Sequence, residues 1–405
     1  KMLFLGYLFG VRSERRLVEE TKVNVAYRWF LGFTLEDKIP DASTFSQNRR
    51  RRFNQSQIYQ EIFDEIVLQA IRRNMVGGKV LYTDSTHLKA SANKNKFIEK
   101  EVAKSTRDYL EELEKDVTQD RCDHGKKPLK SKEEAEQTKT VKVSTTDPDS
   151  GYMIRDGKPK GFFYLDHRTV DSRHSIITDT HVTPANVHDS IPYLGRLDRQ
   201  LERFGFDVEA VGLDAGYSTA AICKGLEDRH IFGVIGYRRF GRVNGRFTKR
   251  DFSYDESIDC YVCPENCLLR YRTTNREGFR EYASSASFCK NCPLLSKCTT
   301  SKNSTKIITR HVWESSKERI NDNRRTERGK MLYAKRKETV ERSFADSKEL
   351  QGHRYAKMRG LSKIREQCLL CAAVFNMKKI ALHLSRGGRK PPFGGVISTR
   401  YNSVG

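Results

Sequence analysis

Residues 208–217 have the sequence VEAVGLDAGY, which contains the clearest indication of the fold. Its first six residues are mostly apolar and favour a buried strand, and Asp214 follows at the carboxyl end of that strand. A helical segment is expected at 218–226, and a second apolar strand at 231–235. A strand, a helix and a strand in this order predict a parallel βαβ unit, so we expect an α/β fold.

Two further acidic residues stand out by their surroundings. Asp84 lies within the alternating stretch 79–86, a predicted strand of apolar and hydroxyl-bearing residues, where a lone carboxylate is costly unless compensated. Glu341 lies on a predicted helix at 329–350. Ligands of open α/β sheets bind beyond the carboxyl ends of the strands, which is the position that Asp214 occupies.

Three carboxylates from two strands and a helix suit a pair of Mg²⁺ ions. Two such ions, ~4 Å apart, activate a water and stabilise the leaving oxygen in phosphodiester cleavage. Lys337 and Lys348 share the helical face of Glu341 and would hold a DNA backbone. Taken singly, each acid is better explained structurally: Asp84 would cap a turn, Asp214 would cap a helix and Glu341 would pair with a lysine. The trio together favours the metal site.

The composition favours a nucleic-acid partner. The chain has 75 Lys and Arg against 52 Asp and Glu, a formal net charge of +23, and basic side chains that neutralise phosphates release counterions. Solubility, a membrane surface or a ribosomal role are the alternatives. We expect no membrane-spanning segment and no signal peptide, and therefore a cytoplasmic, nucleoid-associated protein.

Arginines are concentrated near the N-terminus. Arg49, Arg50, Arg51 and Arg52 fall on a predicted helix that also carries Phe45 and Phe53. A helical bundle with such a cluster can lie on double-stranded DNA, and a solvated charged helix is an equally good interpretation. The predicted domains are a helical N-terminal DNA-binding domain at 1–75, an α/β core at 76–250 and 305–385 with a charged insertion at 97–140, a cysteine-rich insertion at 251–304, and a basic flexible tail at 386–405.

Further elements follow from the periodicity. Strands near 162–170 and 176–182 form a predicted hairpin, and helices are expected at 187–204 and 362–384. Within the charged insertion, the composition predicts a highly charged helix over 97–120 and a lysine-rich, turn-rich loop over 121–140.

Six of the ten cysteines fall between Cys260 and Cys298, in two C-x-x-C pairs and two single positions. Such clustering without a signal peptide favours a structural zinc site over disulfides. On pairing alone, the ligands would be Cys260, Cys263, Cys289 and Cys292. Reduced thiols packed in a small core are the alternative.

The acidic motifs resemble those of DDE transposases of bacterial insertion sequences, within the ribonuclease H-like superfamily. The resemblance lies in LYTDST at 81–86, VGLDAGY at 211–217 and ERSFADSK at 341–348. Residues 3–53 resemble the InsH-type N-terminal domain that precedes the core in this group. Matching stretches extend from about residue 3 to about residue 380, without the charged region at 97–140.

The resemblance implies a ribonuclease H-like mixed sheet and a zinc-ribbon-like insertion. It implies that Asp84, Asp214 and Glu341 bind Mg²⁺ or Mn²⁺, and that Lys348 contacts DNA. It also implies cleavage of element ends, joining of the 3′-hydroxyl to target DNA, and a dimer or larger assembly on DNA. The family's cysteine strings favour a different zinc set, namely Cys263, Cys289, Cys292 and Cys298.

One departure from the family signature concerns the helix of Glu341. Tyr333 and Arg336 lie one position away from the usual register, and Lys337 occupies the place of the arginine. Besides a transposase, two other functions remain open. One is a zinc-containing DNA-binding regulator without catalysis, and the other is a nuclease on the same core that does not join DNA.

Overall fold

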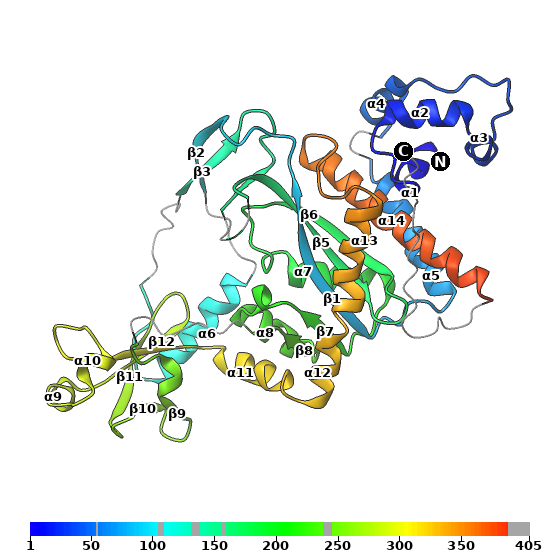
Figure 1. The fold of residues 1–405 in the computed structure, drawn as a ribbon. Helices are drawn as coiled ribbons and strands as arrows, with labels where there is room; N and C mark the ends of the chain where they lie inside the picture. The colour runs from blue at the N-terminus through cyan, green and yellow to red at the C-terminus, as the bar shows by residue number, and fades with distance from the viewer. Residues whose placement is uncertain are drawn as a thin grey trace.

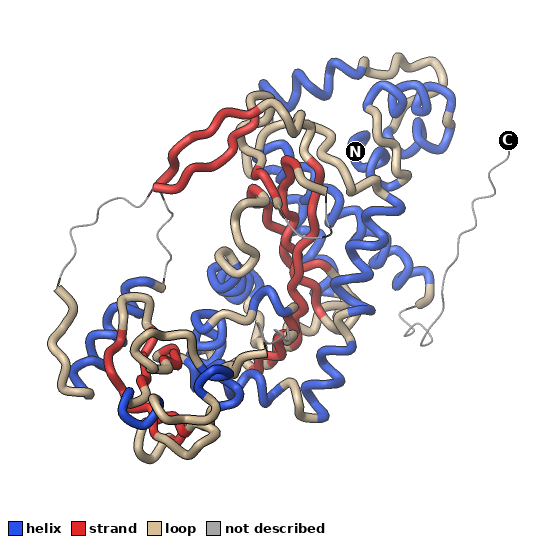
Figure 2. Tube along the Cα trace, turned by 60° about the vertical axis from the view of Figure 1, so that its left-hand side comes forward, coloured by secondary structure: helices blue, strands red, loops and turns tan. Residues whose placement is uncertain are grey.

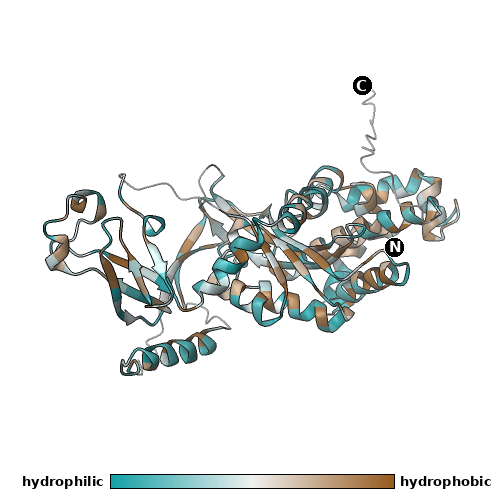
Figure 3. Cartoon of the chain, turned by 90° about the horizontal axis from the view of Figure 1, so that it is seen from below, coloured by the Kyte–Doolittle hydropathy of each residue, from teal (hydrophilic) through white to brown (hydrophobic). Residues whose placement is uncertain are grey.

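A mixed β-sheet lies at the centre of the molecule, between a helical N-terminal part and a smaller antiparallel sheet (Figures 1 and 3). The computed structural model describes residues 1–53, 56–103, 109–130, 138–154, 157, 159–237 and 245–387. The predicted tail at 386–405 lies almost wholly outside these residues.

The central sheet has six strands in the order β4-β5-β1-β7-β8, with β6 paired to β5. β1 is antiparallel to β5 and parallel to β7, and β7 is parallel to β8, so the βαβ unit predicted from the sequence is confirmed. This is the mixed α/β sheet expected of a ribonuclease H-like core. The strands are β1 (Val80–Lys89), β4 (Gly151–Met153), β5 (Gly161–Asp171), β6 (Ile177–Pro184), β7 (Ala210–Leu213) and β8 (Phe232–Ile235).

Helices cover both faces of this sheet, because alternate strand residues carry apolar side chains to opposite sides. Val80 and Tyr82 of β1 face a core shared with α5 and α14, whereas Leu81 faces a core shared with α7 and α8. These helices are α5 (Ile58–Arg72), α7 (Tyr193–Phe204), α8 (Ala220–Asp228), α11 (Glu314–Asn323) and α14 (Leu361–Ser385). By length and composition α14 could cross a membrane, but it packs in this core.

The N-terminal part is helical, as predicted. Its helices are α1 (Met2–Leu8), α2 (Glu14–Val23), α3 (Val25–Leu31) and α4 (Ala42–Arg51). Side chains at the helix N-termini accept backbone hydrogen bonds in three of them: Ser13 in α2, Asn24 in α3 and Asp41 in α4. A small apolar core of Leu5, Leu17 and Tyr27 holds them together.

The helix predicted over 329–350 is interrupted. α12 (Glu327–Ala334) is followed by a π-turn (Lys337–Glu341) and then by α13 (Arg342–Leu350). The N–H of Glu341 donates to the carbonyl oxygen of Arg336 over 3.2 Å, five residues back instead of four. One extra residue is thereby accommodated in the helix.

The helix predicted over 97–120 is wrong at its start. Residues Phe97–Ala103 form strand β2, which pairs with β3 (Thr138–Ser144) in a hairpin that extends away from the core (Figure 2). Ile98 and Val102 lie on the same face of β2 among charged residues, a composition that a strand tolerates when it pairs with another strand, here β3. Helix α6 occupies Leu110–Asp123, so the predicted loop also begins too early.

The cysteine-rich region forms a second, antiparallel sheet in the order β13-β12-β11-β10-β9. Its elements are β9 (Ser253–Asp255), β10 (Cys260–Val262), β11 (Leu268–Thr274), β12 (Phe279–Ala283), α9 (Ala286–Cys289), α10 (Leu295–Cys298) and β13 (Ile307–His311). Strand β13 lies beyond residue 304, so this sheet crosses the predicted domain boundary.

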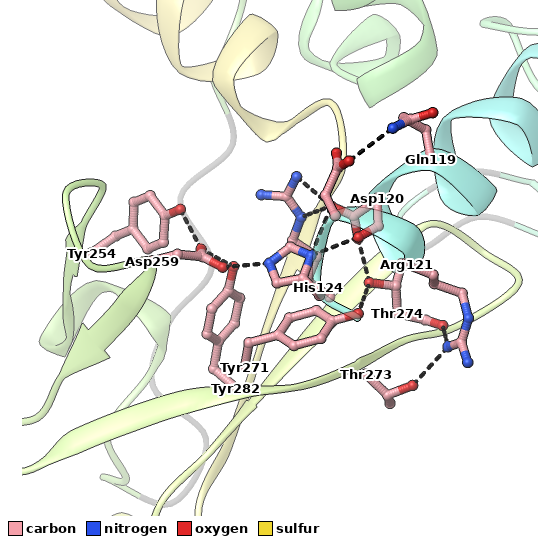
Figure 4. Close-up of polar contacts among 12 residues, drawn as sticks. Gln119, Asp120, Arg121, His124, Tyr254, Asp259, Tyr271, Thr273, Thr274 and Tyr282 are labelled. Atoms are coloured by element: carbon pink, nitrogen blue, oxygen red, sulfur yellow. Dashed lines mark hydrogen bonds and ion pairs between the residues drawn. The ribbon is translucent and has the colours of Figure 1, made fainter. Parts of the chain in front are cut away.

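Helix α6, which lies in the charged insertion, packs against this second sheet. Buried Asp120 accepts hydrogen bonds from Arg280 (2.7 Å) and Thr274, and His124 contacts Asp259 over 2.7 Å (Figure 4). The ring of His124 stacks on Tyr271 at 3.7 Å between centroids. Two insertions that are far apart in the sequence therefore fold as one unit, which we call the composite module: α6 and β9–β13.

The substitution Asp120→Ala tests this unit. It leaves the half-buried Arg280 without its carboxylate, so we expect a loss of roughly 1–3 kcal/mol in the free energy of unfolding of the module. Urea unfolding followed by fluorescence of Trp313, which packs against α6, measures the loss. Glu114→Ala, on the exposed face of α6, is the matched control. Equal destabilisation by both variants would contradict the prediction.

Candidate active site

Two of the predicted acids lie side by side on neighbouring strands. Thr83 of β1 pairs with Leu213 of β7, so Asp84 and Asp214 come next along two parallel strands and project from the same face of the sheet. Asp84 accepts the N–H of Ser85 at 2.8 Å. Asp214 accepts the N–H of Gly216 at 2.7 Å, so its predicted structural role at the following turn is present as well.

Arg336 connects the third acid to this pair. Its guanidinium donates to Asp84 Oδ2 at 2.8 Å and lies 3.7 Å from Glu341 Oε1. Arg336 is 5% exposed at its side chain, against 20% for Asp84 and 46% for Glu341. The three acids thus converge on one edge of the sheet, with an arginine between two of them.

The π-turn explains the departure from the family register. In an α-helix, residues five apart point about 140° away from each other. Arg336 and Glu341 share a face because the π-turn takes up one residue between them. Arg336 therefore faces Glu341 although it lies five residues before it, and Lys337 is exposed.

A buried ion network positions the helix of Glu341. Arg168 lies on β5, opposite Asp84 in the register of β5 with β1. Its guanidinium donates hydrogen bonds to Ser343 O (3.3 Å) and to Ser347 Oγ (2.8 Å) of α13. Its Nε donates to Asp166 at 2.9 Å, and both side chains are fully buried. A fixed charge on the sheet thereby holds α13 next to Asp84.

His353 and two cysteines complete this network. His353 Nε2 lies 2.8 Å from Asp166 Oδ2. Burial opposes protonation of His353, but its contacts with Cys371 and Asp166 hold its pKa well above the ordinary value. Burial raises the pKa of Cys371, yet His353 and Arg168 lower it to about 7. Cys371 is thus more acidic than an ordinary buried thiol.

Asp166, His353 and Cys368 are the one group within the described ranges whose possible metal-ligating atoms all lie within 4.8 Å. Asp166 already accepts hydrogen bonds from Arg168 and Thr180, and a guanidinium cation is its closest counter-ion. We therefore interpret this group as an ion network that attaches α13 and α14 to the sheet.

The acidic trio fits divalent cations by its chemistry, although it is wider than 4.8 Å in the described structure. Mg²⁺ needs few protein carboxylates, because water and phosphate oxygens complete its shell. The negative charge of Asp214 adds to the burial that raises the pKa of Asp84, as expected for two carboxylates that lie near each other. Asp84, Asp214 and Glu341 are the residues that would hold the metal.

Comparisons with known proteins agree with this arrangement. Residues 262–381 match the family described as a transposase DDE domain, and residues 1–51 match a transposase domain (DUF772). Two separate parts of the chain are therefore similar to transposase domains. The matched DDE segment contains Glu341 but neither Asp84 nor Asp214, so the assignment of those two rests on geometry. No curated protein matches the sequence.

Two solved structures show weak similarity. One is titled "Crystal structure of the Mos1 mariner paired end complex with Mn", at 12% identity and a TM-score of 0.18, covering 54% of this chain and 56% of that chain. The other is titled "Mos1 transposase paired-end complex with left transposon end", at 11% identity and a TM-score of 0.19, covering 55% and 56%. The chain thus spans little more than half the length of these proteins, and such scores support no conclusion about activity.

The residues predicted to contact DNA differ in their exposure and in their ion pairs. Arg49 forms ion pairs with Glu14 (2.6 Å) and Glu366 (2.8 Å), so in this state it joins the N-terminal transposase domain to α14. The other three arginines of the cluster are exposed: Arg50, Arg51 and Arg52. Lys337 is exposed and Lys348 partly buried on the helix of Glu341.

Five cysteines of the second sheet and its two short helices influence one another electrostatically, although in the described structure no three of their sulfur atoms lie within 4.8 Å of one another. Burial and the thiols of Cys263, Cys289 and Cys292 raise the pKa of Cys267. Burial and these same thiols also raise the pKa of Cys298, against the influence of Lys306. Cys260 is buried on β10, where its electrostatic neighbours are Asp255, Arg270 and Asp259.

Sequence reasoning missed Arg168, Asp166 and His353. A charged pair inside the continuous strand 161–171 was the available signal, because buried charges occur in strands mainly when they are paired. His353 follows α13 in a loop and offers no such pattern.

The stability of the transposase core should depend on pH through Asp84. Burial raises the pKa of Asp84 to about 6, from an ordinary value of 3.8, with Arg336 opposing and Asp214 adding to the shift. Between these two values the folded state retains a proton that the unfolded chain has lost. The contribution of Asp84 to stability is therefore full below about pH 4 and is lost as the pH rises towards 6.

The variant Asp84→Asn isolates this effect because it does not titrate. We expect its free energy of unfolding to rise relative to the parent by roughly 1–2 kcal/mol across that window. Urea unfolding at several pH values measures the difference. The titration of the Arg336 ion pair is already part of the Asp84 pKa, and the substitution otherwise adds a constant offset, so a difference that does not vary with pH would refute the prediction.

Proposed function

We propose that this protein is a transposase that cleaves the ends of a DNA element and joins the 3′-hydroxyl ends to target DNA by a two-metal DDE mechanism. The observation that carries the proposal is the convergence of Asp84, Asp214 and Glu341 on one sheet edge. The two transposase-domain matches support the same conclusion.

Each part of the site has a role in this mechanism. The acids Asp84, Asp214 and Glu341 hold two Mg²⁺ or Mn²⁺ ions, which supply water activation and stabilisation of the leaving oxygen. The sheet and the Arg168 network keep the acids in place, so that the backbone phosphate meets a preformed arrangement. Lys337 and Lys348, on the same helical segment as Glu341, bind the flanking phosphates.

The partner is double-stranded DNA, both at the terminal inverted repeats and at the target. A formal net charge of +23 supports strong, salt-dependent backbone binding. Exposed Arg50 also lines a cavity of about 1280 Å³ between the N-terminal helices and α14, together with Arg15 and Lys363. The protein acts as a homodimer or larger assembly on two DNA ends, in the cytoplasm at the nucleoid.

The cysteine cluster binds a structural zinc ion. Four thiolates leave no open coordination position, so the ion stabilises the composite module and takes no part in cleavage. Cys263, Cys289, Cys292 and Cys298 are the proposed ligands, and Cys267, whose pKa is raised by burial and by three of these thiols, is the alternative to one of them. The neighbours of Cys260 are charged residues, which argues against the set that includes it.

Glu341→Gln tests the catalytic proposal. The substitution removes one metal-binding charge while preserving size, so we expect Mg²⁺-dependent cleavage of element-end DNA to fall by at least ~10³-fold, a loss typical for an essential electrostatic group. DNA affinity, measured by fluorescence anisotropy, should remain within about threefold of the parent.

Glu338→Gln is the matched control, because Glu338 is exposed on the same turn and has no contact with the other acids. Cleavage by Glu341→Gln at the control rate would remove Glu341 from the mechanism. If DNA is cut but a labelled 3′-hydroxyl end is never joined to target DNA, the protein is instead a nuclease built on the same core.

Metal analysis of the purified chain tests the zinc proposal. We expect about one zinc ion per chain and its loss in Cys289→Ser, since three thiolates bind far more weakly than four. Cys260→Ser should retain the zinc. Comparing Cys267→Ser with Cys298→Ser identifies the fourth ligand, and zinc that persists in all four variants would contradict the site.

A further inference from the structure

A cation is already present between two of the three acids. The guanidinium of Arg336 lies 2.8 Å from Asp84 and 3.7 Å from Glu341, on an almost wholly buried side chain. Within the described ranges, no other ion pair joins the strand of Asp84 to the helical segment of Glu341. The arginine therefore neutralises the same charges that a metal ion would neutralise.

We infer that Arg336 is the counter-cation of the metal-free trio and competes with the divalent ions for Asp84 and Glu341. The inference rests on the proposed function, because it assumes that the trio binds metal. A metal ion that took up Asp84 Oδ2 would displace the guanidinium from this oxygen, because two cations at short distance from one oxygen repel each other. Metal affinity in this chain is thus set partly by an internal competitor.

The surroundings of Arg336 hold its guanidinium beside Asp84 without satisfying all of its hydrogen-bond donors. Its Cγ packs over Gly212 of β7, where a Cβ would lie 3.5 Å away. Its Nε is buried and donates no hydrogen bond within the described part of the chain. A buried donor left unsatisfied costs free energy, so the metal-free arrangement is not the best one available to this side chain.

The π-turn supplies the second structural support. Such turns are rare inside α-helices and are frequently found at functional sites. Here the turn aligns Arg336 with Glu341, and Thr339 Oγ1 donates to Lys335 O at 2.8 Å within it. A continuous α-helix would point the guanidinium away from Glu341 and leave the acids without this counter-ion.

Calorimetric titration of the full, DNA-free chain with Mn²⁺ alone tests the inference. Arg336→Gln removes the competing charge but retains polarity, so we expect it to bind Mn²⁺ about tenfold more tightly than the parent. Arg336→Lys retains a positive charge and should lie closer to the parent. Arg342→Gln is the matched control, because Arg342 pairs with Asp346 on the exposed face of α13 and should leave affinity unchanged.

The outcomes separate this inference from the proposed function. If the parent binds Mn²⁺ through Glu341 but Arg336→Gln binds it equally or more weakly, the competition is refuted and the metal site stands. If Mn²⁺ binding to the parent is unaffected by Glu341→Gln, the proposed metal site fails and the inference falls with it.

A crystal structure of the parent with Mn²⁺ provides a readout that needs no variant at Arg336. We expect the guanidinium to have left Asp84 when Mn²⁺ is bound to the trio. A guanidinium that remains in hydrogen-bond contact with Asp84 beside the bound ion would overturn the inference.

Discussion

The buried contact between Arg168 and the helix of Glu341 is the constraint on which the site depends. Asp84 and Asp214 are adjacent because β1 and β7 are parallel neighbours, but the pairing of these two strands does not determine where Glu341 lies. Arg168, neutralised by Asp166, binds Ser343 and Ser347 and thereby fixes α13 over the sheet. A charge inside the protein is costly, and it persists here because it is paired and hydrogen-bonded.

Much of the core follows from local sequence patterns. The apolar run before Asp214, the following helix and the next strand predict a parallel unit, and the structure has it. That unit alone brings two acids together, since the carboxyl ends of neighbouring parallel strands share an edge. The position of Arg336 could not be predicted in the same way, because the π-turn depends on how α12 and α13 pack and not on residue preferences.

The charged insertion at 97–140 shows another limit of local patterns. Strand β2 contains several charged residues and pairs only with β3, across 34 intervening residues, so a helix was the natural expectation for that stretch. Helix α6 joins the second sheet through Asp120 and His124, whose partners lie more than 100 residues further along the chain. Contacts at such separations become visible only in three dimensions.

The π-turn also has a consequence for recognising relatives of this chain. Signature patterns count residues between an arginine and a glutamate, whereas the chemistry depends on the helical face that the two side chains share. An inserted residue absorbed by a single wide turn leaves that face intact while shifting the count by one. Patterns with fixed intervals will therefore overlook such sequences, and allowing one optional residue before the glutamate would recover them.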